Sequence, residues 1–150
     1  MTLDKIKDPG SAITHFIAMV AAIIGAFPLL FKAARNPDHT AVFALAVYII
    51  SLILLYAAST TYHTFNISEK VNTILKKWDH MMIFVLIAGS YTPVCLLVLD
   101  KHTGVILLTL VWAIATIGII LKAFWVFCPK WVSSLLYIGM GWTCILAYSQ

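Results

Sequence analysis

The sequence predicts an all-α, polytopic transmembrane helical bundle, and two observations support that prediction. Of the 150 residues, 62% are hydrophobic and only 11% are charged, far less charge than a soluble domain needs to cover its surface. The charged residues also cluster, leaving five predominantly apolar stretches at about residues 13–34, 41–62, 80–99, 103–121 and 131–148. Because about 20 apolar residues cross a bilayer as a helix, each stretch is predicted to be one span. A secreted disulfide scaffold, a nucleic-acid-binding domain and a soluble enzyme are excluded.

The first apolar stretch, 13–34, is predicted to be a membrane helix and not a cleaved signal peptide. It is long enough to span, it lacks a convincing small-residue cleavage site, and residues 1–11 before it contain charges of both signs. Pro28 falls in its last third, and the turn signal at residues 36–38, Asn-Pro-Asp, closes the loop that follows.

The later connections predict how the remaining spans are arranged. A loop over residues 64–78 is expected between the second and third spans. The third and fourth spans are joined by Asp-Lys-His at residues 100–102, a link so short that these spans must be antiparallel neighbours. The fifth span is expected at 131–148.

The basic residues predict the orientation of the bundle, because Lys and Arg accumulate on the cytoplasmic side of membrane proteins. Seven of the ten fall on one side of the predicted spans: Lys5, Lys7, Lys70, Lys76, Lys77, Lys122 and Lys130. The other side has Lys32, Arg35 and Lys101. We therefore expect a cytoplasmic N-terminus, with Gln150 outside. The net charge of +4 then reflects topology and does not indicate a nucleic-acid partner.

Polar residues at the rims of the spans are the candidates for function, because polar groups are costly in a bilayer. Ser59 and His63 lie four residues apart at the cytoplasmic end of the second span and so share a helix face. Asp79 and His80 lie at the start of the third. If the loop folds back, His63 and Asp79 reach the same depth, where imidazole, carboxylate and hydroxyl groups suit zinc. His63 would bind the metal, Asp79 would bind it or a metal-bound water, and Ser59 would orient either one.

Each of these residues also has a structural interpretation. Ser59 can bond back to the carbonyl one turn earlier in its own helix. His63 and Asp79 can act as polar caps at the membrane boundary. His15, near the cytoplasmic end of the first span, either joins the polar cluster or hydrogen-bonds a neighbouring helix.

The cysteines give no sign of a disulfide or a thiolate metal site, because no Cys-x-x-Cys pair occurs. We predict that they are buried small side chains: Cys95, Cys128 and Cys144.

Three strings resemble the haemolysin III family of bacterial membrane proteins. They are Ser-Thr-Thr-Tyr-His-Thr-Phe over residues 59–65 with Ser-Glu-Lys-Val over 68–71, Trp-Asp-His over 78–80, and Ile-Ala-Gly-Ser-Tyr-Thr-Pro over 87–93. The segment over residues 8–15, Asp-Pro-Gly-Ser-Ala-Ile-Thr-His, is similar to the start of the family's first helix. The resemblance covers essentially the whole chain. It implies a seven-helix protein of the bacterial plasma membrane with its N-terminus in the cytoplasm.

The resemblance also implies two kinds of activity. The family takes its name from cytolysis by pore formation. It is related to the progestin and adipoQ receptors and, more distantly, to alkaline ceramidases. In the receptors zinc is held by the histidine matching His63 and by a His-xxx-His motif on the seventh helix, with the residues matching Asp79 and Ser59 close by. This arrangement implies metal-assisted hydrolysis of a lipid amide, with Asp79 and Ser59 as the catalytic residues.

The sequence departs from this pattern in one respect that matters for function. No His-xxx-His motif occurs in residues 1–150, and five spans are predicted instead of seven. We therefore expect a chain that lacks the last two helices and an incomplete zinc site, with His15 or His80 as the remaining candidate ligands. The first prediction is a haemolysin III-like membrane protein that permeabilises membranes; the alternative is a zinc-dependent lipid amide hydrolase. Membrane lipids and further copies of the chain are the expected partners.

Overall fold

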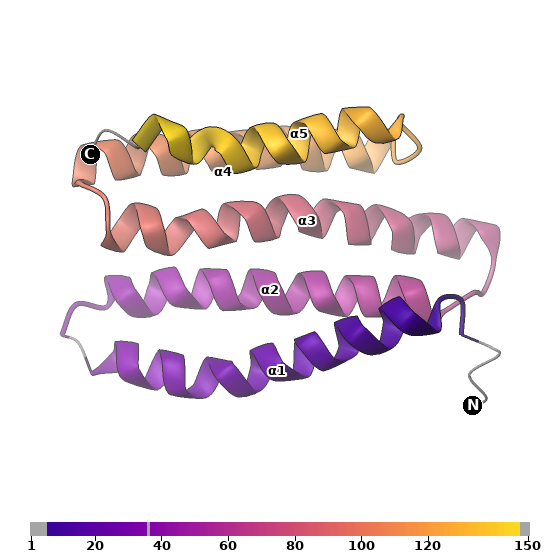
Figure 1. Ribbon diagram of the computed structural model, residues 1–150, viewed down its shortest axis with the longest axis horizontal. Coiled ribbons are helices and arrows are strands. Elements are labelled where there is room, and N and C mark those ends of the chain that lie inside the picture. Colours follow the sequence, from indigo (N-terminus) through magenta and orange to yellow (C-terminus); the bar gives the residue numbers. More distant parts are fainter. Residues whose placement is uncertain (1–5, 36, 148–150) are drawn as a thin grey trace.

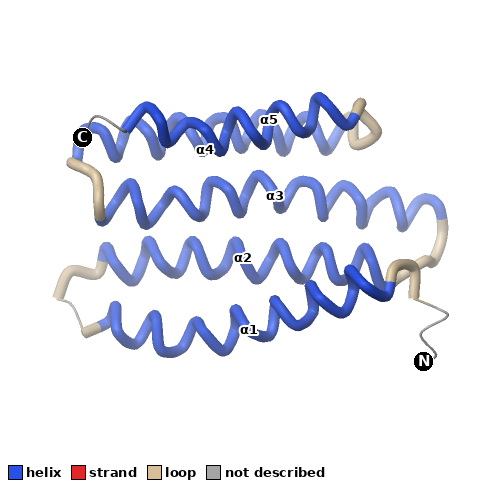
Figure 2. The backbone as a smooth tube through the Cα atoms, viewed as in Figure 1, coloured by secondary structure: helices blue, strands red, loops and turns tan. Residues whose placement is uncertain are grey.

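The computed structural model describes residues 6–35 and 37–147, and within these ranges the chain forms five α-helices and no strand. The helices are α1 (Pro9–Ala34), α2 (Thr40–Thr64), α3 (Glu69–Leu97), α4 (Lys101–Phe124) and α5 (Lys130–Trp142), followed by a 3₁₀ helix, η2 (Thr143–Ala147). Successive helices run antiparallel, and α5 lies alongside α4 (Figure 1). The connections are short and gather at the two ends of the bundle (Figure 2). The predicted all-α bundle is confirmed.

Four of these helices, α1 to α4, are long and apolar enough to cross a membrane, so the chain is an integral membrane protein. The expected fifth span has a different form. Its α-helix has 13 residues, a length of about 20 Å, and tightens into η2 over the next turn. Residue 148, where this span was expected to end, lies outside the described residues, as do Lys5 and Gln150.

The predicted loop over residues 64–78 is wrong, because α3 begins at Glu69 and the link from α2 is only residues 65–68. Ser68 is the N-cap of α3, and its Oγ accepts a hydrogen bond from the Val71 amide at 3.3 Å. Glu69 then places a negative charge in the first turn, where the helix dipole favours it. With 29 residues α3 is about 43 Å long, so it extends beyond the apolar part that predicted the span.

The core lies where α3, α4 and α5 meet, around the fully buried side chains of Phe84, Val111 and Met140. Small residues allow the helices to approach closely, as is usual in membrane bundles. Gly104 of α4 lies against the backbone carbonyl of Cys95, and Gly118 of α4 lies against the Phe84 ring.

The start of α1 and the α2–α3 and α4–α5 connections lie at the same end of the bundle (Figure 1). We call this the N-terminal end. It is the end at which most of the basic residues were expected. The candidate residues for function also lie toward it.

Candidate functional site

The beginning of α1 is fixed by Asp8, which is the N-cap of the helix and is followed by Pro9 in its first turn. The Asp8 carboxylate accepts hydrogen bonds from the Ser11 amide at 3.4 Å and from the Ser11 hydroxyl at 2.7 Å. An acidic N-cap before proline is a strong local signal for a helix start.

The segment before α1 is also bound to the last turn of α2. The Lys7 and Asp8 amides donate to the carbonyls of Thr64 and His63, at 3.4 and 2.9 Å. The Lys7 ammonium lies 3.5 Å from the centre of the Tyr62 ring. These contacts hold the start of α1 against the end of α2 and bring Asp8 beside His63.

Four side chains form a polar group there, which we call the α1–α2 cluster: Asp8, His15, Ser59 and His63. Asp8 Oδ2 lies 3.2 Å from His63 Nδ1, and His15 Nδ1 lies 2.7 Å from Ser59 Oγ. The two imidazole rings meet edge to face with their centres 5.7 Å apart. Ser59 is buried. Thus His15 does both things considered for it: it bonds a neighbouring helix and stands beside His63.

Asp79 is not part of this cluster. It is a buried residue, ten positions into α3, and its Oδ2 lies 3.7 Å from His80 Nδ1, too far for a hydrogen bond. His80 Nδ1 instead donates to the Lys76 carbonyl at 2.8 Å.

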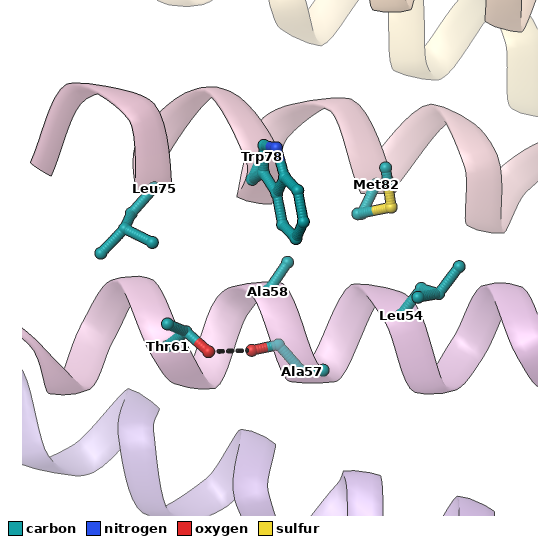
Figure 3. A pocket seen from close by; sticks show the side chains of 7 residues that line it. All are labelled: Leu54, Ala57, Ala58, Thr61, Leu75, Trp78 and Met82. Carbon is teal, nitrogen blue, oxygen red and sulfur yellow. Dashed lines mark hydrogen bonds between the residues drawn. The ribbon is translucent and has the colours of Figure 1, made fainter. Parts of the chain in front are cut away.

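The contact between α2 and α3 shows why Asp79 and His63 do not meet. Figure 3 places Leu75 opposite Thr61, and Trp78 opposite Ala58. Asp79 directly follows Trp78 in α3, whereas His63 lies five residues beyond Ala58, toward the end of α2. The longer α3 moves Asp79 deeper into the bundle than the sequence suggested.

A cavity of about 310 Å³ lies between α2 and α3, and Figure 3 shows the side chains that line it. It is lined almost entirely by apolar side chains, and the Thr61 hydroxyl in its wall is bonded to the Ala57 carbonyl at 2.7 Å. The helical periodicity of α2 places these lining residues on the face opposite Ser59 and His63. The cavity is therefore separate from the α1–α2 cluster.

Comparison with known proteins decides the family. The family model described as "Haemolysin-III related" matches residues 3–150. The chain belongs to the haemolysin III-related family. It is 41% identical over 141 residues to "Hemolysin-3" of Bacillus cereus, covering 94% of this chain and 64% of that protein. It is 36% identical over 141 residues to "Hemolysin-3 homolog" of Bacillus subtilis (strain 168), covering 94% of this chain and 66% of the relative. The chain thus spans just under two thirds of these relatives, and no solved structure matches it.

A zinc site in this haemolysin III-related chain was expected at His63 and Asp79. Across residues 6–35 and 37–147, no group of three His, Cys, Asp or Glu side chains is close enough to hold a metal ion. His63 Nδ1 faces the Asp8 carboxylate, and Asp79 lies at another depth. The described residues therefore do not fit a zinc ion by themselves, and no chemical step is assigned to one.

The electrostatics of the α1–α2 cluster depend on Asp8. Hydrogen bonds from Ser11 hold the pKa of the Asp8 carboxyl below its ordinary value, and the His63 ring lowers it further. A carboxyl with a lowered pKa stabilises the folded state above its ordinary pKa, and that contribution is lost as the pH falls through the lowered value. Protonation of the Asp8 carboxyl in acid therefore weakens the helix start in this haemolysin III-related chain.

A second polar group in the haemolysin III-related chain was not foreseen from the sequence. We call it the α4–α5 cluster: Lys122, Cys128 and Ser133. Lys122, 1% exposed, donates hydrogen bonds to Cys128 Sγ at 3.0 Å and to Ser133 Oγ. Cys128 is buried, as predicted, but beside an ammonium group and not among apolar side chains. No motif marks this arrangement, because the turn between α4 and α5 brings the three residues together.

The other two cysteines differ from each other. Cys95 is buried in the core, as predicted. Cys144 is exposed, contrary to prediction, because it lies in η2 on a side that the bundle leaves open; its Sγ contacts the Gly141 carbonyl at 3.4 Å.

Proposed function

We propose that this haemolysin III-related protein makes bilayers permeable. Its relatives bear the name Hemolysin-3, and the family match covers nearly the whole chain. The structural observation that supports the proposal is the bundle of four apolar helices, which inserts the protein into the bilayer on which it would act.

The interior of a single copy does not resemble an aqueous channel. The buried Ser51 hydroxyl donates to the Tyr48 carbonyl at 2.7 Å. The buried Thr92 hydroxyl donates to the Ala88 carbonyl at 3.0 Å and accepts from Trp112 Nε1 at 3.3 Å. These polar groups are satisfied within the bundle, whereas a conducting path needs polar groups facing water along its length. We infer that leakage arises where several copies meet.

Release of a trapped dye from liposomes tests the proposal. The purified chain, reconstituted at a series of protein-to-lipid ratios, is expected to release dye more steeply than in proportion to its density, because several copies must meet. An unrelated four-span protein at matched density is the control. Release equal to that control at every ratio would contradict the proposal, and strictly proportional release would contradict the requirement for several copies.

We propose further that the N-terminal end of the bundle lies in the cytoplasm, as the excess of basic residues indicates. Lys70 and Lys101 are exposed and lie at opposite ends. In a background without native cysteines, Lys70→Cys in intact cells should resist a membrane-impermeant maleimide, while Lys101→Cys should react. The reverse pattern would overturn the orientation.

A second candidate function is hydrolysis of a lipid amide by a zinc-dependent site. The observation in its favour is the α1–α2 cluster, which gathers Ser59 and His63 with His15. Such a site requires ligands in addition to the described residues. The family resemblance suggested such ligands in a His-xxx-His motif.

Zinc analysis of the protein purified from its own membrane, in the longest form that its gene encodes, tests this candidate. His63→Ala is expected to lower the zinc content and ceramide hydrolysis together. His39→Ala, an exposed position at the other end of the bundle, should change neither. Equal zinc content in both variants, or none in the unaltered protein, would exclude this function.

A further inference from the structure

A cavity of about 610 Å³ opens at the N-terminal end between α3, α4 and α5. The α4–α5 cluster forms one wall, and the other polar side chains of the lining are Lys76, His80, Ser134 and Tyr137. This cavity is distinct from the α1–α2 cluster and from the apolar cavity of Figure 3.

The buried charge of Lys122 is the main indication that this cavity binds an anion. Its ammonium group is almost completely buried, and its hydrogen-bond partners among the described residues are a thiol and a hydroxyl. A buried cation is costly unless an anion lies beside it. Asp79 is the buried carboxylate of α3, but it lies beside His80 and does not line the cavity.

The second lysine of the cavity adds to the positive charge. The Lys76 ammonium lies 4.5 Å from the centre of the Phe127 ring, a contact that leaves its charge unneutralised. Its neighbour Lys77 is used differently, since it donates to the Ala123 carbonyl at the end of α4. Lys76 and Lys122 thus make the cavity cationic.

The wall formed by α5 suits an anion as well. The helix begins after Pro129 with no side chain capping its N-terminus, the end at which free amides and the helix dipole favour negative charge. Ser133 and Ser134, in this first part of α5, add hydroxyl donors.

The surroundings of the cavity indicate its depth in the membrane. Three large aromatic side chains of the α4–α5 connection and the start of α5 are exposed, and the second of them also lines the cavity: Trp125, Phe127 and Trp131. Aromatic side chains gather at the level of lipid headgroups, and basic pockets between helices at that level bind anionic headgroups. We propose that this cavity binds the phosphate group of an anionic phospholipid from the surrounding leaflet, with Lys122 and Lys76 as the binding cations.

Cys128 offers a competing source of negative charge. Burial raises the pKa of its thiol, but hydrogen bonds with Lys122 and Ser133 lower that pKa by more, so the net shift is downward. A thiolate would offset Lys122 alone and leave Lys76 free to bind phosphate. Replacing Cys128 by serine, which keeps a hydrogen-bonding group but does not ionise, separates the two sources.

The experiment measures thermal unfolding of the purified full chain in a neutral detergent, followed by tryptophan fluorescence. Phosphatidylglycerol should raise the unfolding temperature, and phosphatidylcholine at equal concentration should raise it much less. Inorganic phosphate is the third arm; protection by it without protection by phosphatidylglycerol would overturn the assignment to a lipid.

The variants identify the site. Lys76→Gln should weaken the apparent affinity for phosphatidylglycerol about tenfold, the change expected for one lost charge-assisted hydrogen bond. Lys122→Met should weaken it at least as much; if that variant does not fold, Lys76→Gln and native mass spectrometry of retained lipid decide alone. Cys128→Ser, which removes the competing thiol, should bind phosphatidylglycerol at least as tightly as the unaltered protein. Lys101→Gln, at the other end, should leave binding unchanged. Unaltered binding in Lys76→Gln, or lost binding in Cys128→Ser, would overturn the proposal. The test does not depend on dye release, so it can fail or succeed independently of the proposed permeabilising activity.

Discussion

Replacing Gly104 by alanine is expected to lower the free energy of unfolding of the bundle by about 2–3 kcal/mol. A Cβ atom at this position would overlap the carbonyl oxygen of Cys95 on α3. That oxygen belongs to the backbone, so no change of rotamer relieves the overlap. The two helices must separate, and core contacts between α3 and α4 are lost with them.

Gly25→Ala is the matched control for this substitution, because a Cβ atom there meets nothing within 4 Å. The control should be unchanged or slightly more stable, since alanine favours helix by about 1 kcal/mol over glycine. Unfolding in mixed micelles with increasing dodecyl sulfate, followed by circular dichroism, compares the two variants. Equal midpoints would show that α3 and α4 approach less closely than the structure indicates.

Gly118→Ala should lower the free energy of unfolding by about 1–3 kcal/mol, because here too an added Cβ atom would overlap a neighbour. Its Cβ atom would overlap the ring of Phe84, a fully buried side chain that also packs on Tyr137 with ring centres 4.7 Å apart. Here the obstacle is a side chain, so a smaller residue at position 84 should relieve it.

In the double variant Gly118→Ala with Phe84→Leu, the loss in free energy of unfolding is therefore expected to be smaller than the sum of the losses in the two single variants. The difference should be about 1 kcal/mol or more. The same unfolding assay on the four proteins of the cycle gives this coupling. Simple additivity would mean that the ring moves aside without loss. No comparable rescue is available for Gly104, because its neighbour is backbone.

Hydropathy located the spans well because the bilayer imposes one requirement, a long apolar helix, that sequence reports directly. It failed at α3, where Ser68 caps a helix that begins at Glu69, eleven residues before the predicted span at 80–99. A helix start set by capping does not alter the hydropathy of the residues that follow. The shortness of α5 was also missed, since the stretch over residues 131–148 contains no charged residue whether it is α-helical or tightens into η2.

The sequence predicted the part of the candidate site that lies on a single helix. Ser59 and His63 share a face of α2, as their spacing predicted, and both turn toward α1. The depth of Asp79 in the bundle was not predicted, because it depends on where α3 starts. Asp8 was not predicted either, because it comes from a short segment before α1. The signal for Asp8 was available, because an aspartate before proline is typical of a helix start. Lys122 and Cys128 come together only through the turn between α4 and α5.

The hydrogen bonds from Lys7 and Asp8 to the end of α2 have a consequence for how the protein is made. Their acceptors, His63 and Thr64, are synthesised more than fifty residues later. During synthesis the segment before α1 therefore cannot make these hydrogen bonds until the end of α2 has been made. The order of translation thus makes completion of the second span, and not insertion of the first, the step that assembles the α1–α2 cluster.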